Sequence, residues 1–407
     1  MSAFSAKRYR FTATAAIFAT TIVGLSLSGT DTGAKAQLVP PVVPDVASWQ
    51  QFVLAVSPSG TVGKVTYETF ASDQDIYVSN PCPSPKPSSA SVCNSPTWPS
   101  ATNATKTLQR SLLGRTNAHP ATGEPSRFKI EVIGPKQGCG KPSGIDQAAK
   151  GSKFPKDGCI GEEVRRDRPS FDYLVTNGLW STAGLVQYYA TNQPVSLPWN
   201  TLEVKADWIP VKTLATWLGQ SESFVTTNFY TSSVKLETGE TKPFAMTSMH
   251  LMVKSPGFPN WVWANFENAF VPGRCDVTGC TDSYGATKTY VPPNPTAWGQ
   301  YGACPKTAAV SAMMTNASVA PVFANYCMTG SQTAFTANSL PTLLGSPVIE
   351  TLNANVALTK SSCISCHAGA SFNASGKPGR VNTTIGPNAP ASGYIGYDLM
   401  WGVLGAQ

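Results

Sequence analysis

The sequence predicts an α+β protein: a β-rich main domain stapled by disulfides, with a small, mostly helical or irregular C-terminal module packed on it. Only 13 % of the 407 residues are charged, whereas 34 are glycine and 33 are proline, a composition typical of loop-rich, largely β proteins. Several short segments alternate apolar and polar residues with the period of a strand. Eight of the ten cysteines fall into four closely spaced pairs.

The beginning of the chain has the pattern of a secretory signal peptide over 1–36. A basic start is followed by an apolar run over 11–27 and by the small-x-small sequence Ala34-Lys35-Ala36, which predicts cleavage before Gln37. A membrane anchor is the alternative, but Thr, Ser and Gly dilute the run and no long apolar span follows. We therefore expect a periplasmic or secreted protein without stable insertion in a membrane.

The first part of the mature chain is predicted to mix helix, strand and loop. Residues 48–55 have the pattern of a short helix with Ser48 as its N-cap, and 65–70 have strand composition. The other expected segments are an extended stretch over 37–47, a Ser/Pro/Asn-rich loop over 79–103 and a strand over 128–132.

The central part is predicted to supply most of the sheet. Residues 171–189 are expected to be helical, with a break at Asn177-Gly178, and 202–208 alternate apolar and charged residues like a half-buried strand. The other expected elements are strands over 250–253 and 261–266 joined by a turn at 255–257, a loop over 272–305, a helix over 340–356 and an irregular last forty residues.

The paired cysteines predict disulfides, because an even number of cysteines in an exported protein usually forms bridges. We expect nearest neighbours to pair, although eight cysteines allow many other connectivities and free buried thiols are the alternative. The expected pairs are Cys82 with Cys93, Cys139 with Cys159, Cys275 with Cys280, and Cys304 with Cys327. The loops that they close are rich in Pro, Gly and Ser, so a covalent link would replace missing apolar contacts.

The remaining two cysteines lie in Cys363-Ile364-Ser365-Cys366-His367, the attachment pattern of a c-type haem. Two thiols three residues apart on a helical turn can each add to a haem vinyl group, and the next histidine then becomes the proximal iron ligand. A redox disulfide or half of a zinc site is the alternative, but no second Cys/His pair lies nearby. We predict one covalent haem c on Cys363, Cys366 and His367.

Several blocks together resemble a family of exported bacterial monohaem proteins, the cytochrome c family proteins. The blocks are Ser48-Trp49-Gln50-x-Phe52, Phe171-Asp172-Tyr173 with Asn177-Gly178-Leu179-Trp180, Glu203-Val204-Lys205-Ala206-x-Trp208, His250, Trp261-x-Trp263-Ala264-x-Phe266-Glu267, and Ser361-Ser362-Cys363-x-x-Cys366-His367. The resemblance implies haem binding and electron transfer, and it implies no particular substrate.

The resulting domain prediction is a β-rich domain over 37–335 and a cytochrome c-like haem module over 336–407. Ordinary small cytochromes c carry a methionine ligand downstream of the motif, followed by a closing helix. Only Met400 lies downstream here, and we expect the β-rich part to cover the haem instead. His250, in an apolar strand, and Met400 are the two candidate distal iron ligands, with an open site as the third alternative. His119 is expected to be a surface residue.

Two further groups have both a structural and a functional interpretation. Glu203, Lys205 and Asp207 alternate along one strand, and we expect a solvated face rather than catalytic carboxylates acting with Glu267. Trp261 and Trp263 share a strand face, which indicates core packing or contact with the haem edge.

The predicted function is electron transfer, without a catalytic constellation. The sequence has no G-x-G-x-x-G loop or Walker-type loop, and no Lys/Arg cluster of the kind that binds nucleic acid. A net charge of +7, still mildly basic without the signal segment, favours an acidic redox partner protein. The alternatives are a haem-dependent oxidoreductase, whose β-rich domain binds a small molecule, and a haem-based sensor or binding module.

Overall fold

In this computed structural model, every described residue belongs to the part of the chain from Val39 to Gln407. The described residues are 43–61, 63–78, 81–82, 93–99, 106–107, 109–110, 131–132, 161–235, 241–271, 275, 280–287, 304–348, 350, 358–381 and 384–406.

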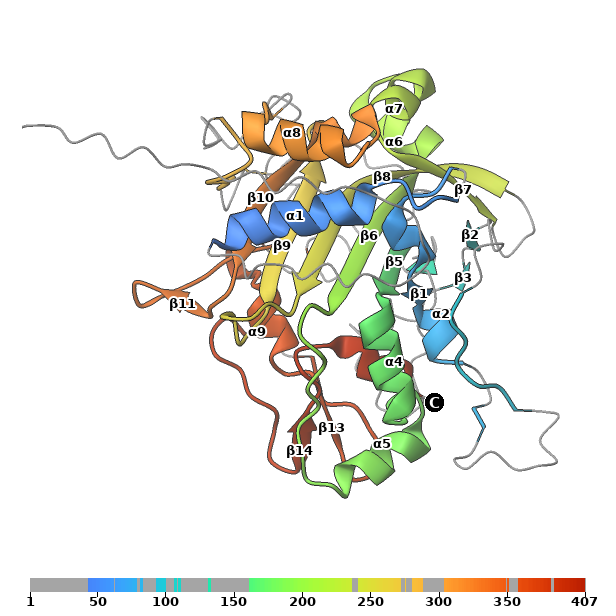
Figure 1. The fold of residues 1–407 in the computed structure, drawn as a ribbon, viewed down its shortest axis with the longest axis vertical. Helices are drawn as coiled ribbons and strands as arrows, with labels where there is room; N and C mark the ends of the chain where they lie inside the picture. The colour runs from blue at the N-terminus through green and yellow to red at the C-terminus, as the bar shows by residue number, and fades with distance from the viewer. Residues whose placement is uncertain are drawn as a thin grey trace, which may run out of the picture. The chain divides into compact units, whose positions relative to one another are not determined.

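A mostly antiparallel sheet forms the centre of the fold (Figure 1). Its described strands are β1 Ala71–Ser72, β2 Lys106–Thr107, β3 Gln109–Arg110, β4 Glu131–Val132, β5 Gly161–Arg166, β6 Leu202–Pro210, β7 Thr231–Lys235, β8 Thr241–Val253, β9 Val262–Asn268 and β10 Tyr326–Gln332. The main order is β10-β9-β8-β6-β5-β4-β3; β1 pairs with β5, β7 with β8, and β2 with β7. Two small hairpins join β11 Thr336–Ala337 to β12 Leu340–Pro341, and β13 Ser371–Asn373 to β14 Tyr394–Gly396.

Helices lie on both sides of this sheet and beside its lower end in Figure 1. The described α-helices are α1 Pro44–Val56, α2 Asp73–Ile76, α4 Arg168–Thr176, α5 Thr182–Tyr189, α6 Val211–Leu218, α7 Glu222–Asn228, α8 Ala308–Asn316 and α9 Cys363–His367. Short 3₁₀ turns are η1 Thr66–Thr69, η4 Pro321–Asn325, η6 Leu358–Lys360 and η7 Trp401–Gly405. Helix α1 packs across β8, β9 and β10, with α8 beside it.

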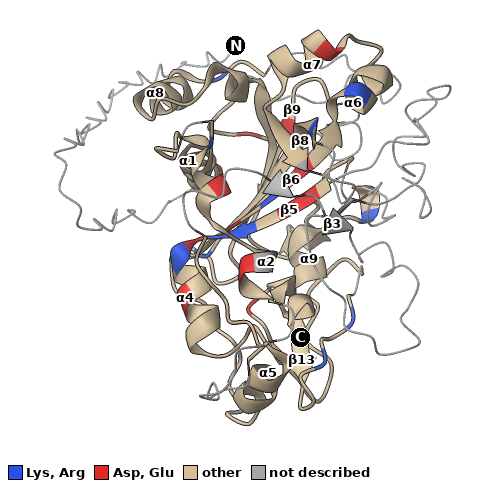
Figure 2. Ribbon diagram, turned by 90° about the vertical axis from the view of Figure 1, so that its right-hand side faces the viewer, with Lys and Arg blue, Asp and Glu red and all other residues tan. Residues whose placement is uncertain are grey.

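The two faces of the sheet differ in chemistry because side chains alternate along each strand. The face toward α1 is apolar: Val204, Leu251 and Ala264 pack in one cluster with Trp49 and Phe52. The opposite face of the same strands is polar, yet it too is buried. It carries Glu203, Lys205 and Asp207 of β6, His250 of β8, and Asn265 and Glu267 of β9. In Figure 2, red and blue segments mark the positions of Asp, Glu, Lys and Arg along the central strands.

The C-terminal segment packs on the polar face through a second apolar cluster. Cys363 and Ile364 of α9 share this cluster with Trp263 of β9, Leu174 of α4 and Phe372 of β13. The Cys-x-x-Cys-His segment is therefore packed against elements from the middle of the chain.

The structure confirms the α+β class and several elements. Helices α4 and α5 separate at Asn177-Gly178, where Gly178 has φ 69°, and β6 covers the predicted strand at 202–208. Strand β8 contains the predicted strand 250–253, β9 covers 262–266 of the predicted 261–266, and a turn closes between Ser255 and Phe258. The small Glu131–Val132 strand agrees with the described part of 128–132.

Three local predictions are wrong. Helix α1 begins at Pro44, and the Ser48 hydroxyl donates to the Pro44 carbonyl inside the helix rather than capping it. Residues 66–69 form η1 rather than a strand, because the Glu68 carboxylate accepts a hydrogen bond from the Val65 N–H and closes a tight turn. Residues 340–348 are not helical, since the prolines there lack an N–H and Leu344 bridges to Ser362.

Three predicted disulfides are present: Cys82–Cys93, Cys275–Cys280 and Cys304–Cys327. The Cys139–Cys159 pair, His119, the signal segment and most of the 79–103 and 272–305 loops lie outside the described residues. Disulfides of this kind fit an oxidising compartment outside the cytoplasm. No helix in the described ranges combines the length and apolar character that a membrane crossing requires.

Candidate functional site

The Cys-x-x-Cys-His sequence forms one short helix, α9, at the edge of the polar sheet face. Ser362 caps its first turn by accepting a hydrogen bond from the Ser365 N–H. Both cysteines are free thiols, Cys363 buried and Cys366 partly buried, so they form no redox disulfide with each other. Burial raises the pKa of Cys366 to about 11 and that of Cys363 also above its ordinary value. Both sulfurs are therefore protonated near neutral pH.

His367 at the end of α9 is held in one orientation by the backbone. Its Nδ1 lies 2.8 Å from the carbonyl oxygen of Leu399, and because a carbonyl can only accept, Nδ1 carries the proton. Burial lowers the pKa of His367 to about 4, so the ring is neutral near pH 7. Its Nε2 is then a free electron-pair donor, the state that a metal-ligating imidazole requires. Trp263 packs against the ring, with 4.7 Å between centroids.

His250 lies on the same sheet face as the charged residues of β6. It is paired in register with Lys205 of β6 on one side and with Asn265 of β9 on the other. The residue is 7 % exposed, and its Nε2 has no hydrogen-bond partner among the described residues. Burial, followed by the charges of Lys205 and His367, lowers the pKa of His250 well below its usual value. The imidazole is therefore neutral and buried with an unused polar atom, which is costly unless a ligand meets it.

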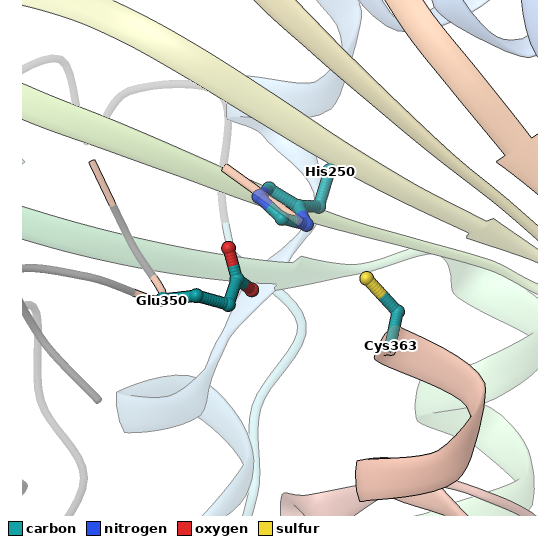
Figure 3. Close-up of side chains that lie close together, drawn as sticks. All are labelled: His250, Glu350 and Cys363. Carbon is teal, nitrogen blue, oxygen red and sulfur yellow. The ribbon is translucent and has the colours of Figure 1, made fainter. Parts of the chain in front are cut away.

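Three potential ligand atoms converge at this point (Figure 3). Donor atoms of His250, Glu350 and Cys363 all lie within 4.8 Å of one another. In the figure the Glu350 carboxylate points toward the imidazole from one side, and the Cys363 sulfur faces it from α9. Burial raises the pKa of Glu350 to about 7, although the charge of Lys205 opposes this. The structure thus brings His250 of the sheet next to the haem motif.

Met400, the other candidate ligand, is fully buried in the apolar cluster that also contains Cys363. It directly follows Leu399, whose carbonyl holds the Nδ1 edge of His367. The Met400 backbone therefore lies on the Nδ1 side of the His367 ring, whereas a metal bound to this imidazole would lie on the Nε2 side.

The charged residues of β6 correct a sequence prediction. Asp207 is fully buried and Glu203 is 5 % exposed, so the three alternating charges do not form a solvated face. Lys205 pairs with Glu162 of β5 at 2.8 Å, and Glu203 pairs with Arg166 at 2.7 Å. Alternation alone indicates which side chains share a face, but the partners that accompany their burial come from other segments of the chain. Nothing in the sequence pattern indicated that Glu162 would pair with Lys205 or that Glu350 would lie beside His250.

The two tryptophans are core residues, as the structural interpretation expected. Trp261 and Trp263 are 0 % and 2 % exposed and belong to the cluster that contains α9. Their packing also places an indole against His367, so one side chain serves both the core and the site.

The residues fit a covalent haem by the chemistry of their donors. Two free thiols stand three residues apart, a neutral imidazole presents Nε2, and a second buried imidazole nitrogen has no hydrogen-bond partner within the described ranges. Comparisons with protein-family models, curated proteins and solved structures returned no match. The function of the chain is therefore inferred from this geometry and from the Cys363–His367 motif.

Proposed function

We propose that this chain is an exported monohaem c-type cytochrome that transfers electrons. Cys363 and Cys366 would hold the haem through thioether bonds, and His367 would be its proximal ligand. When bound, the haem supplies one-electron redox chemistry. The observation that carries the proposal is His250 Nε2, a buried imidazole nitrogen for which the described part of the chain offers no hydrogen-bond partner, beside a Cys-x-x-Cys-His helix whose own imidazole is fixed through Nδ1.

We propose His250, rather than Met400, as the sixth ligand. A donor atom of His250 lies within 4.8 Å of the Cys363 sulfur in the motif, whereas the Met400 backbone lies on the Nδ1 side of His367. A second imidazole usually leaves the iron at a lower potential than a methionine sulfur does. With both axial positions occupied, electron transfer is favoured over chemistry on a bound small molecule.

Absorption spectroscopy of the full chain, expressed with export and haem-maturation machinery, tests the proposal. We expect pigment that remains with the protein in acidic acetone, low-spin spectra in both oxidation states, and no binding of carbon monoxide to the reduced form. Colourless protein, or pigment released by acidic acetone, would overturn the proposal. Rapid binding of carbon monoxide would instead favour an oxidoreductase or a sensor with the same covalent haem.

The surface charges of the C-terminal segment support an acidic redox partner. Among the described residues from 358 onward, the exposed charged side chains are Lys360, Lys377 and Arg380, all basic. Positive charge on the segment that carries the motif would accelerate encounter with an acidic protein, and this effect weakens as salt increases.

A second candidate function is a divalent transition-metal site. Imidazole nitrogen, carboxylate oxygen and thiolate sulfur are all zinc ligands, and the donors of His250, Glu350 and Cys363 already converge. This function excludes the first, because a Cys363 thioether cannot supply a thiolate. Stoichiometric zinc in colourless exported protein, lost in Glu350→Gln, would favour it.

A further inference from the structure

Three non-glycine residues near His367 have left-handed backbone conformations. The φ angles of Trp261, Asp398 and Leu399 are 66°, 51° and 64°. This region is unfavourable for side chains larger than Asn or Asp, and a large apolar residue such as Leu399 occupies it only where surrounding contacts hold it. Two consecutive residues of this kind form a turn whose second carbonyl accepts the proton of His367 Nδ1.

The Asp398 carboxylate is the contact that holds this turn. One oxygen accepts hydrogen bonds from the Leu197 N–H at 2.6 Å and from the Lys254 ammonium at 2.7 Å. The other accepts from the Trp261 indole N–H at 3.3 Å. The donors come from two segments that are both far from Asp398 in the sequence, Leu197 and the β8–β9 connection that carries Lys254 and Trp261, so the carboxylate ties the C-terminal turn to the main body of the protein.

Lys254 makes this attachment a charged one inside the protein. The residue is 6 % exposed, and its ammonium also donates to the Ser196 hydroxyl at 3.0 Å. Hydrogen bonds between ionised partners are shorter and stronger than neutral ones, and removing one partner leaves the other charge buried. The position of Leu399 is therefore defined by a buried ion pair one residue before it.

We infer that Asp398 is a positioning residue for the proximal iron ligand. Through the strained Asp398-Leu399 turn it places the Leu399 carbonyl on His367 Nδ1, which selects the tautomer with Nε2 free and fixes the plane of the ring. The inference rests on the proposed function, because it concerns His367 as a ligand. When a carbonyl accepts the proton of Nδ1, the other ring nitrogen, Nε2, donates its electron pair to the iron more strongly. This favours ferric iron and lowers the reduction potential.

The test compares reduction potentials of the haem-loaded full chain. In Asp398→Ala the turn is released, and we expect an upward shift of the midpoint potential, with a smaller upward shift in Asp398→Asn, which retains an acceptor. Asp172→Ala is the matched control, because Asp172 forms an exposed pair with Arg168 away from His367. A potential in Asp398→Ala equal to that of Asp172→Ala and the unchanged protein would overturn the inference.

If Asp398→Ala does not fold, a second variant tests whether Asp398 positions His367. Lys254→Met removes the charged partner and leaves the Leu197 and Trp261 contacts to Asp398, and it should also raise the potential. An unchanged potential in folded Lys254→Met and Asp398→Asn would count against the inference.

Hydrogen exchange at His367 Nδ1 gives a second readout, and comparing its rate with that of backbone N–H groups in the central sheet of the same variant separates release of the turn from a general loss of stability. The chain has three histidines, so ¹⁵N-histidine labelling of the reduced, low-spin protein produces few signals. We expect a His367 Nδ1–H that exchanges slowly with solvent and that exchanges faster in Asp398→Ala. Equal exchange would contradict the role of the turn. Absence of covalent haem in the unchanged protein would instead refute the proposed function, before Asp398 is tested.

Discussion

The side chain of Gln332, at the end of β10, accepts a hydrogen bond from the Ile364 N–H in the first turn of α9, at 3.0 Å between Oε1 and N. The Gln332 amide nitrogen donates to the hydroxyls of Ser362 at 2.9 Å and Thr342 at 2.7 Å. The glutamine is 3 % exposed, and both the oxygen and the nitrogen of its side-chain amide form hydrogen bonds. One sheet residue therefore fixes the beginning of the helix that carries both thiols and His367.

Replacing this anchor should weaken the attachment of α9. Gln332→Leu keeps the approximate size but leaves the buried Ile364 N–H without its acceptor, at a cost of roughly 1–3 kcal/mol, and removes one of the donors to the Ser362 hydroxyl. We expect a lower midpoint in urea unfolding and a lower yield of haem-loaded protein. Gln220→Leu at the exposed end of α6 is the control and should change neither. Equal unfolding midpoints in the two variants would show that the anchor is dispensable.

One pair of variants distinguishes between His250 and Met400 as the sixth ligand. His250→Ala removes the buried nitrogen that faces the motif, so we expect a high-spin ferric spectrum and binding of carbon monoxide to the reduced protein. Met400→Leu preserves the apolar cluster behind His367 and should leave the low-spin spectrum in place. An unchanged low-spin spectrum in His250→Ala would remove His250 as the ligand.

Glu203 should make the protein less stable as pH increases. Burial raises its pKa from 4.5 to about 7, although Arg166 opposes the shift. Between these values the unfolded state has lost the proton that the folded state retains, so the free energy of unfolding falls as pH rises from 4.5 to 7. The full loss is about 3 kcal/mol.

Urea unfolding from pH 4.5 to 8, followed by tryptophan fluorescence, measures this effect. Glu203→Gln has no proton to lose, so its stability should fall less over that interval than that of the unchanged protein. Glu222→Gln on the exposed start of α7 should follow the unchanged protein. Parallel curves for all three would mean that Glu203 ionises normally in the folded state.

The Cys304–Cys327 disulfide connects a loop to β10, the strand that carries Gln332. It joins residues 23 positions apart, and a loop of this length corresponds to about 3 kcal/mol of stabilisation. The double variant Cys304→Ser/Cys327→Ser should lower the melting temperature more than Cys275→Ser/Cys280→Ser, whose loop spans 5 positions. The reverse order in a thermal scan would contradict this prediction.

Patterns confined to a few residues were predictable from the sequence. Alternation located β6, a glycine marked the break between α4 and α5, and short spacing between cysteines identified three disulfides. Predictions failed where a local contact outweighed composition: Glu68 closes η1, and Pro44 begins α1 four residues before Ser48. Neither the Glu68 hydrogen bond nor the early start of α1 alters the spacing of apolar residues, which is the signal from which helices and strands are predicted.

By itself, the sequence determined the Cys363–His367 motif, the strand that presents His250 and the pairing of nearby cysteines, because each depends on spacing along the chain. Tertiary structure alone decided that the charges of β6 are buried, that His250 lies beside Cys363 and Glu350, and that Asp398 holds the turn behind His367. Those relationships join residues that are up to 201 positions apart, as in the Leu197–Asp398 hydrogen bond. A periodic pattern assigns a side chain to one face of a strand, but what covers that face depends on where the rest of the chain folds.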